Sequence, residues 1–338
     1  MKTILVTGAN GFVGTHVLHA LSTQAEVNVI AACRDRRKLT ESFRGEIREG
    51  DIRDSTYRKS LLEGVDVLVN AMAWSSLWGH SKASTELFYQ PNVKLIDEYL
   101  KSKASLYVNI SSTSVAAPHM SNTPADAMAV GKAPYFWPHL GNVVNIENYL
   151  RDNATQEKSV INMRLGLFAG EHYSLGLLPI LIPRMKTHLV PWVSAGQTGM
   201  PIIDGRDIGQ AMALAATNDT LSGYQSFNVV GPTVPKAREV IKFIANEYSL
   251  PEPHFSVPFT VAYPFAWLME KLDPVLPWEP LIVRSIIHLL EETGATNARV
   301  SAELGYQPEY SWKESISSQM SEMSKKQKKP MRMAQPIA

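Results

Sequence analysis

The fold is decided near the start of the chain by the sequence TGANGFVG, which occupies Thr7–Gly14. It follows the apolar run Thr3–Val6, which has the pattern of a buried strand, and it opens a segment with apolar residues at helical spacing. Glycines at such a strand-to-helix turn are typical of a dinucleotide cradle, because they allow a tight turn, close approach of a pyrophosphate and close packing of helix on strand. The unpaired amides at the helix start favour an anion. We expect the pyrophosphate to lie against this turn, formed by Gly8, Asn10, Gly11, Phe12, Val13 and Gly14.

The rest of the first half repeats the strand-then-helix alternation. Further apolar strands are predicted at 27–33, 66–71, 106–110 and 159–165, and long helices at about 83–103 and 140–150. Strands that are apolar throughout indicate a parallel sheet covered on both faces. The prediction is therefore an α/β protein, with a Rossmann doubly wound parallel sheet and a smaller C-terminal α/β substrate lobe.

The domain organisation follows from this pattern. Residues 1–171, completed by 202–230, are predicted to form an NADP-binding Rossmann domain. Residues 172–201 and 231–322 would form the substrate-binding lobe, and the basic segment 323–338 is expected to be a disordered tail. A stretch rich in Pro and Ala near 118–138 predicts a long loop at the carboxyl edge of the sheet.

Composition limits the function classes. The 338 residues are 45% hydrophobic and 19% charged with a net charge of +1, so no bulk charge attracts nucleic acid. The single Cys33 excludes an internal disulfide and favours a reducing, cytoplasmic location. The histidines show no metal-site spacing, so no metal is expected. The longest uncharged apolar stretch, 257–269, is too short to span a membrane.

The end of the second predicted strand bears on cofactor choice. An NAD site usually places a carboxylate there, but this chain has Cys33 followed by Arg34. A guanidinium suits a 2′-phosphate by charge and geometry, so NADP is favoured over NAD. Asp51 and Ile52 are expected to flank the adenine.

Further segments carry a family resemblance over nearly the whole chain. They are VNAMA at 69–73, SLWG at 76–79, IIDGRDI at 202–208 and AELGYQP at 302–308. The chain thereby resembles the extended short-chain dehydrogenases/reductases of the NAD-dependent epimerase/dehydratase family, in particular the 3β-hydroxysteroid-dehydrogenase-like branch. The resemblance implies an NADP-dependent oxidoreductase acting on an apolar ketone or alcohol, with an apolar lid at 256–269 and homodimer formation through the two long helices. It also implies cofactor contacts at Ala71, Met72, Ala73 and Ser111.

Catalysis in that family uses a Ser or Thr after the fifth strand and a Tyr-x-x-x-Lys motif on the next helix. The sequence ISSTSV at 110–115 matches the first element and places Ser112 in the catalytic position, with Thr113 and Ser114 as second choices. Thr113 is also a candidate substrate contact, together with Trp74 and Trp78 after the fourth strand.

The Tyr-x-x-x-Lys motif departs from the family pattern. Counting back from Glu147 places Val143 at the lysine position and His139 at the tyrosine position. A histidine could itself donate a proton, Tyr135 could replace it, or this helix could carry no proton donor. The literal match Tyr99 to Lys103 lies before the serine element and is interpreted as surface.

These departures leave other functions open. The same scaffold could serve a non-redox biosynthetic enzyme, such as a cyclase, dehydratase or isomerase, or a non-catalytic NADP-binding regulatory protein. Dinucleotide binding is common to all of these readings.

Overall fold

A computed structural model describes residues 1–273, 275, 280 and 282–328. Its centre is a seven-stranded sheet in the order β10-β6-β5-β4-β1-β2-β3, with every neighbouring pair parallel. The strands are β1 (Lys2–Thr7), β2 (Val27–Cys33), β3 (Glu46–Glu49), β4 (Val67–Asn70), β5 (Leu106–Ser112), β6 (Ser159–Leu165) and β10 (Tyr224–Val229). The predicted doubly wound parallel sheet is confirmed.

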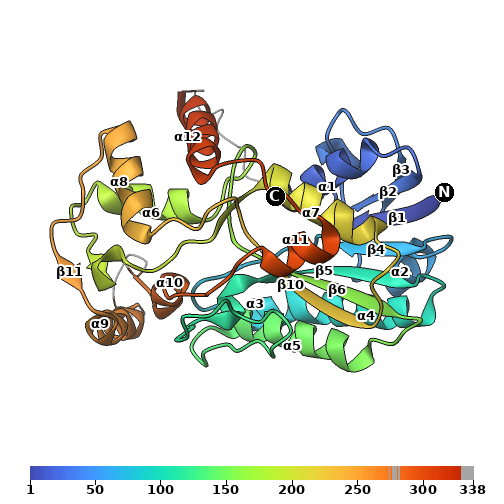
Figure 1. Ribbon diagram of the computed structural model, residues 1–338, viewed down its shortest axis with the longest axis horizontal. Coiled ribbons are helices and arrows are strands. Elements are labelled where there is room, and N and C mark those ends of the chain that lie inside the picture. Colours follow the sequence, from blue (N-terminus) through green and yellow to red (C-terminus); the bar gives the residue numbers. More distant parts are fainter. Residues whose placement is uncertain (274, 276–279, 281, 329–338) are drawn as a thin grey trace.

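Helices cover both faces of this sheet (Figure 1). One face carries α1 (Phe12–Ser22), α7 (Gly205–Thr217) and α11 (Ala298–Leu304), and the other carries α2 (Ser55–Leu61), α4 (Gln90–Lys101) and α5 (Pro138–Asn153). The short helix α3 (Ser81–Ser84) and a π-helical turn (Thr85–Tyr89) lead into α4, so the predicted long helix is not uniform. Along β1, β2 and β4 apolar side chains alternate between the two faces, and each face is buried in its own core cluster.

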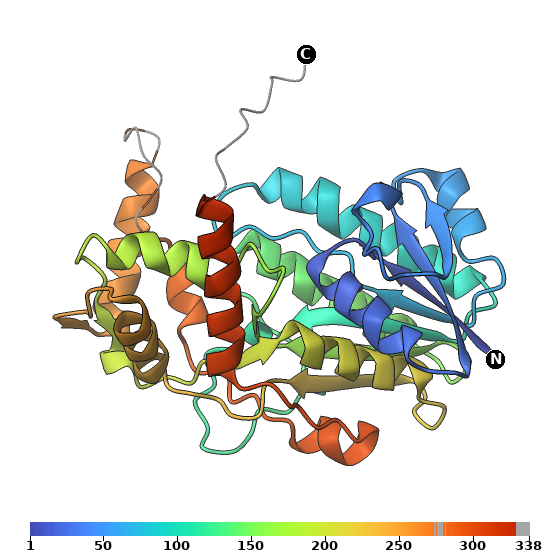
Figure 2. The same ribbon diagram turned by 90° about the horizontal axis from the view of Figure 1, so that it is seen from above.

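A smaller lobe lies beyond the carboxyl ends of the strands (Figures 1 and 2). It contains the helices α6 (Leu177–Met185), α8 (Ala237–Tyr248), α9 (Phe259–Leu272), α10 (Arg284–Leu289) and α12 (Trp312–Lys328), with the short strands β8 (Trp192–Val193) and β11 (Ser256–Val257). A two-stranded sheet of β7 (Leu167–Ala169) and β9 (Ile202–Asp204) joins the lobe to the main body. Because ligands of doubly wound sheets bind outside the carboxyl edge, this arrangement puts the lobe over the expected site.

Three details differ from the sequence predictions. Val300, Leu304 and Tyr306, assigned to the lobe by sequence, pack into the main core beside the sheet. The segment expected to be disordered from residue 323 continues α12 as far as Lys328, and 329–338 lie outside the described residues. Tyr99, interpreted as surface, is fully buried, and its hydroxyl donates to the carbonyls of Ser105 and Ser159.

The predicted apolar lid corresponds largely to α9. This helix exposes Val261, Phe265, Trp267 and Leu268 to between 46% and 54% of their surface, so its outer face is unusually apolar. Within the described part of the chain, no helix combines the length and the apolar character needed to cross a membrane.

Candidate cofactor and substrate site

The glycine turn after β1 has room for backbone only. Gly8 adopts φ +62°, and a Cβ on it would lie 2.6 Å from the carbonyl oxygen of Ala71. A Cβ on Gly14 would lie 2.2 Å from the carbonyl oxygen of Gly8. Neither position can therefore hold a larger residue without movement of the backbone.

This turn lies where the order of the strands in the sheet reverses. The chain passes from β1 outward to β2 and then returns to β4 on the other side of β1, so β1 and β4 flank the topological switch point. The helix α1 begins at Phe12, and its N-cap residue Gly11 supplies no side-chain hydrogen bond. The amides of the first turn, including those of Val13 and Gly14, are thus left for an external acceptor. The side chain of Val13 itself is buried in the core, so only its backbone can contact a ligand.

Aromatic residues from the β7 region close over the start of α1. The ring of Phe12 lies 4.6 Å from that of Tyr173 and 5.9 Å from that of Phe168. Burial raises the pKa of Tyr173 to about 12, so this phenol stays neutral. Asn10 is fixed by donating from its amide to the carbonyl of Asp35 at 3.3 Å.

In the loop after β2, some basic residues form ion pairs with carboxylates and others do not. Arg37 forms an ion pair with Asp35 at 2.8 Å, and Arg36 forms one with Glu49 at 3.3 Å. The Arg34 guanidinium is exposed and makes neither a hydrogen bond nor an ion pair among the described residues. Among Arg34, Arg36 and Arg37, it is therefore the unpaired one.

Two carboxylates near this loop are already engaged. Asp35, which the sequence analysis overlooked as a carboxylate close to the end of β2, accepts hydrogen bonds from the backbone and side chain of Arg37. These bonds hold the pKa of Asp35 below its usual range. Hydrogen bonds from Arg53 lower the pKa of Asp51 to about 2. Ile52, the second residue expected near the adenine, packs partly buried against the core.

On the β4 side, the predicted contacts Ala71, Met72 and Ala73 follow the strand end directly. The amide of Ala71 donates to the carbonyl of Thr7 at 3.2 Å, which holds the β4 end against the glycine turn. Ala73 is exposed, whereas Ala71 is buried. The end of β4 therefore lies directly beside the glycine turn that follows β1.

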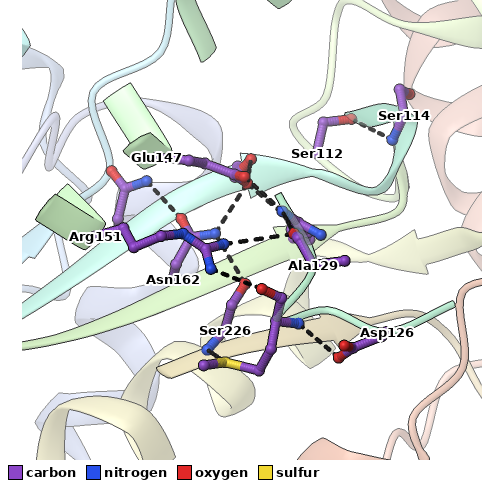
Figure 3. Close-up of polar contacts among 12 residues, drawn as sticks. Ser112, Ser114, Asp126, Ala129, Glu147, Arg151, Asn162 and Ser226 are labelled. Atoms are coloured by element: carbon purple, nitrogen blue, oxygen red, sulfur yellow. Dashed lines mark hydrogen bonds and ion pairs between the residues drawn. The ribbon is translucent and has the colours of Figure 1, made fainter. Parts of the chain in front are cut away.

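Ser112 lies at the end of β5 with its hydroxyl oriented by backbone. Its Oγ accepts the amide hydrogen of Ser114 at 3.2 Å and begins the 3-10 turn Thr113–Ala116 (Figure 3). Such a cap is a common local motif. Because the oxygen accepts, the hydroxyl hydrogen of Ser112 remains available for donation to a ligand. Thr113 is only 1% exposed, which does not favour it as a substrate contact.

Ser111 points the other way, into a buried polar network. Its hydroxyl donates to Glu147 at 2.5 Å, so its side chain does not face a cofactor. Arg164 pairs with the same carboxylate at 2.6 Å, and Asn162 donates to it at 2.9 Å (Figure 3). Arg164 also donates to the carbonyl of Ala129, which ties the predicted long loop over the network. The members of this network are distant in sequence, so no local pattern predicts it.

His139, the proposed proton donor, faces away from this strand end. Its Nδ1 lies 3.1 Å from the Oγ of Ser84, and its ring contacts the rings of Trp74 and Phe88. Burial lowers its pKa to about 4, so the imidazole is neutral at pH 7. Val143, one turn further along α5, packs with apolar neighbours.

Tyr135, the alternative donor, is 87% exposed and belongs to the contact with the lobe. Its hydroxyl accepts a hydrogen bond from Arg284 at 2.9 Å. Trp78 likewise reaches the lobe, donating from its indole to Asp273 at 3.1 Å. The structure therefore places Tyr135 and Trp78 at the junction with the lobe and groups His139 with Trp74 instead of Ser112.

Other candidate ligand sites are weak. A hollow of about 380 Å³ is lined mainly by charged residues at the C-terminal ends of α2 and α4, including Lys59 and Lys101. Those helix ends lie at the amino edge of the parallel sheet, opposite the glycine turn. In the described part of the chain, no three His, Cys, Asp or Glu residues gather as metal ligands.

The fold and the glycine turn together define a protein of the doubly wound Rossmann class. The chain belongs to the NAD dependent epimerase/dehydratase family, whose model matches residues 4–230. This finding confirms the predicted family, while the particular branch stays a prediction.

Solved structures share this fold at low sequence identity. They include gox2253 (TM-score 0.74, 18% identity, 96% of this chain and 99% of that chain). Stenotrophomonas maltophila UDP-glucose-4-epimerase, with bound NAD and formylated UDP-arabinopyranose, has a TM-score of 0.72 at 17% identity, covering 96% of this chain and 100% of that chain. Bacillus cereus UDP-glucuronic acid 4-epimerase, in complex with NAD, has a TM-score of 0.71 at 15% identity, covering 97% and 100%. At these identities the likeness concerns the fold alone.

Proposed function

We propose that the protein binds NADP against the glycine turn and transfers hydride between the dinucleotide and a ketone or alcohol carbon of an apolar small molecule. The observation that carries this proposal is the turn itself, where Gly8 and Gly14 leave no space for a Cβ and the first amides of α1 are uncapped. Such a turn binds a pyrophosphate through backbone donors and the helix dipole.

The residues around the turn fit a nicotinamide dinucleotide. Arg34 supplies a free guanidinium for a 2′-phosphate, while Asp35, the carboxylate that would favour a ribose hydroxyl, is occupied by Arg37. When bound, the dinucleotide would supply the hydride chemistry. The two epimerases named above contain NAD, so NAD is the alternative that a test must distinguish.

Ser112 would hold the substrate oxygen. Its hydroxyl hydrogen is free to donate, and it lies at the carboxyl edge of the sheet under the lobe. Trp74, which follows β4 at the same carboxyl edge and is only partly buried, favours an apolar substrate over the sugar nucleotide present with one of the epimerases. In the reduction the proton would come from water, because His139 contacts Ser84, Trp74 and Phe88 and Tyr135 is held by Arg284.

Two residues of α5, His139 and Val143, favour a second function. His139 and Val143 provide no cation at the position where the family has its Tyr-x-x-x-Lys motif. A dinucleotide-binding protein without a redox step, either a non-redox biosynthetic enzyme or a regulatory protein, would tolerate this replacement.

The test compares Arg34→Ala with Arg36→Ala, which removes another exposed arginine of this loop, one that is paired with Glu49 and leaves the Asp35–Arg37 pair intact. Fluorescence titration of NADPH should show about a 10- to 100-fold weaker affinity for Arg34→Ala, since a charge-assisted contact contributes about 1.5–3 kcal/mol. Arg36→Ala should bind NADPH within about threefold of wild type, and NADH affinity should change little in either variant. Equal losses for NADPH and NADH in Arg34→Ala would overturn the NADP assignment.

Turnover with a panel of apolar ketones and NADPH then separates the two functions. Oxidation of NADPH that depends on the ketone supports the oxidoreductase. Tight NADPH binding without any turnover supports the second function.

A further inference from the structure

His288 connects the lobe to the segment that follows β5. It lies on α10 and is 3% exposed. Its Nε2 is 3.3 Å from the carbonyl oxygen of Ser114, and its ring is edge-on to those of Phe136 and Trp137 at 6.4 and 5.9 Å. One lobe side chain thus contacts both the turn after β5 and the start of α5.

The contact with Ser114 leads directly to Ser112. The amide of Ser114 donates to the Oγ of Ser112 at 3.2 Å, while the carbonyl of the same residue faces His288. A displacement of Ser114 would therefore move the donor that orients the Ser112 hydroxyl. We propose that His288 is a positioning residue for Ser112, which makes the orientation of this hydroxyl depend on the placement of the lobe.

Glu291, in the turn after α10, lies beside the other ring nitrogen of His288. Its Oε2 lies 2.9 Å from the Nδ1 of His288, at ion-pair distance but off the line of a hydrogen bond. Both ring nitrogens of His288 therefore lie beside acceptor oxygens, one of Ser114 and one of Glu291. Tyr263 of α9 approaches the same carboxylate, and Phe136 and Trp137 on the opposite side carry no charge.

The consequence concerns the proposed reaction, on which this inference rests. A lobe that settles over a substrate would hold Ser114 through His288 and so direct the Ser112 hydroxyl toward the substrate oxygen. Without His288, Ser112 would be present but less well oriented, and misplacement by about 1 Å costs up to about 100-fold in rate.

The first arm of the test uses nuclear magnetic resonance on the full chain and needs no catalysis. The variants are His288→Ala, His288→Gln and, as a control, His188→Ala, which changes an exposed histidine of the lobe. The Ser112 and Ser114 amide signals should shift in His288→Ala but not in His188→Ala.

The second arm measures turnover of NADPH with a ketone substrate. His288→Ala should lower kcat about 10- to 100-fold, with NADPH affinity within twofold of wild type. His288→Gln, which can still donate to the Ser114 carbonyl, should recover part of that loss. Combined with Ser112→Ala, the His288→Ala change should add little, because both act through one hydroxyl.

The outcomes separate this inference from the proposed function. A folded His288→Ala protein with unchanged Ser112 and Ser114 amide signals would overturn the positioning role, as would losses that add fully to those of Ser112→Ala. A wild-type protein that binds NADPH but reduces no ketone would contradict the oxidoreductase function, and the amide signals would then decide the positioning role alone.

Discussion

Two neighbouring serines at the end of β5 differ in their contacts because their side chains point in different directions. Ser111 points into the sheet-helix interface and donates to the buried Glu147, whereas Ser112 begins the next turn with its hydroxyl hydrogen free. Sequence alignment placed Ser112 correctly at the strand end, but it could not assign Ser111 to the buried network. The partners of Ser111 come from α5 and β6, and only the folded chain brings them together.

These serines should respond differently to removal of the hydroxyl. Ser112→Ala should lower ketone turnover about 100-fold, as expected for loss of a donor to the reacting oxygen, with a stability change near 1 kcal/mol from the lost cap. Ser111→Ala should cost about 1–3 kcal/mol of unfolding free energy, because it weakens the hydrogen bonding of a buried carboxylate. Steady-state kinetics and urea unfolding of both variants check this, and a Ser111→Ala protein that loses turnover while keeping its stability would contradict it.

The buried imidazole of His139 predicts a pH dependence of stability. Its folded pKa of about 4 lies below the ordinary histidine value of about 6.5, so between these values the unfolded chain binds a proton that the folded chain excludes. Unfolding free energy should therefore fall as pH decreases from 6.5 to 4, by about 3 kcal/mol for this residue. His16, with the same direction and a pKa of about 4, adds a further loss in the same window.

Replacing the imidazole by an amide removes its share of this dependence. His139→Gln should unfold with a shallower pH slope in urea titrations between pH 4.5 and 7, while His16 still contributes. His188→Gln, an exposed change, should keep the wild-type slope. Equal slopes for His139→Gln and wild type would show that His139 is not buried as a neutral group.

Among the elements, the β1–α1 turn is the one that its sequence determines most fully. The glycine spacing, the preceding apolar strand and the amphipathic helix are all local, so the sequence predicted this turn without any tertiary information. The lobe was less predictable. The positions of α9 and α10 depend on contacts with the 133–137 loop, among them the pair of Arg284 and Tyr135, and no local pattern encodes these.

The same turn supplies a prediction about packing. Gly14→Ala should lower dinucleotide affinity more than tenfold and stability by about 3 kcal/mol, because its Cβ would lie 2.2 Å from the Gly8 carbonyl oxygen and the backbone must shift. Gly64→Ala is the matched control, since Gly64 has φ +68° but nothing within 4 Å of an added Cβ. It should cost about 1 kcal/mol in strain and leave binding unchanged. Fluorescence titration and thermal unfolding distinguish the two, and normal binding by Gly14→Ala would contradict the close packing.

At the scale of the whole molecule, the sheet is predictable from sequence. Which residues belong to the main core and which to the lobe is not. Residues 298–306 follow a long lobe segment, yet Val300 and Tyr306 return to the core that contains β1 and α1. This closure joins parts of the chain almost 300 residues apart in sequence, and periodicity cannot reveal such a pairing. The expected homodimer through α4 and α5 belongs to the same scale and stays a prediction.

The central claim is that amides at the start of α1 hold a dinucleotide pyrophosphate. Titration calorimetry of the purified full chain with NADPH and with NADH tests it most directly. The account predicts saturable heat at one site per chain for NADPH and weaker binding of NADH. No heat with either dinucleotide, from protein that unfolds cooperatively and is therefore folded at the outset, would contradict it.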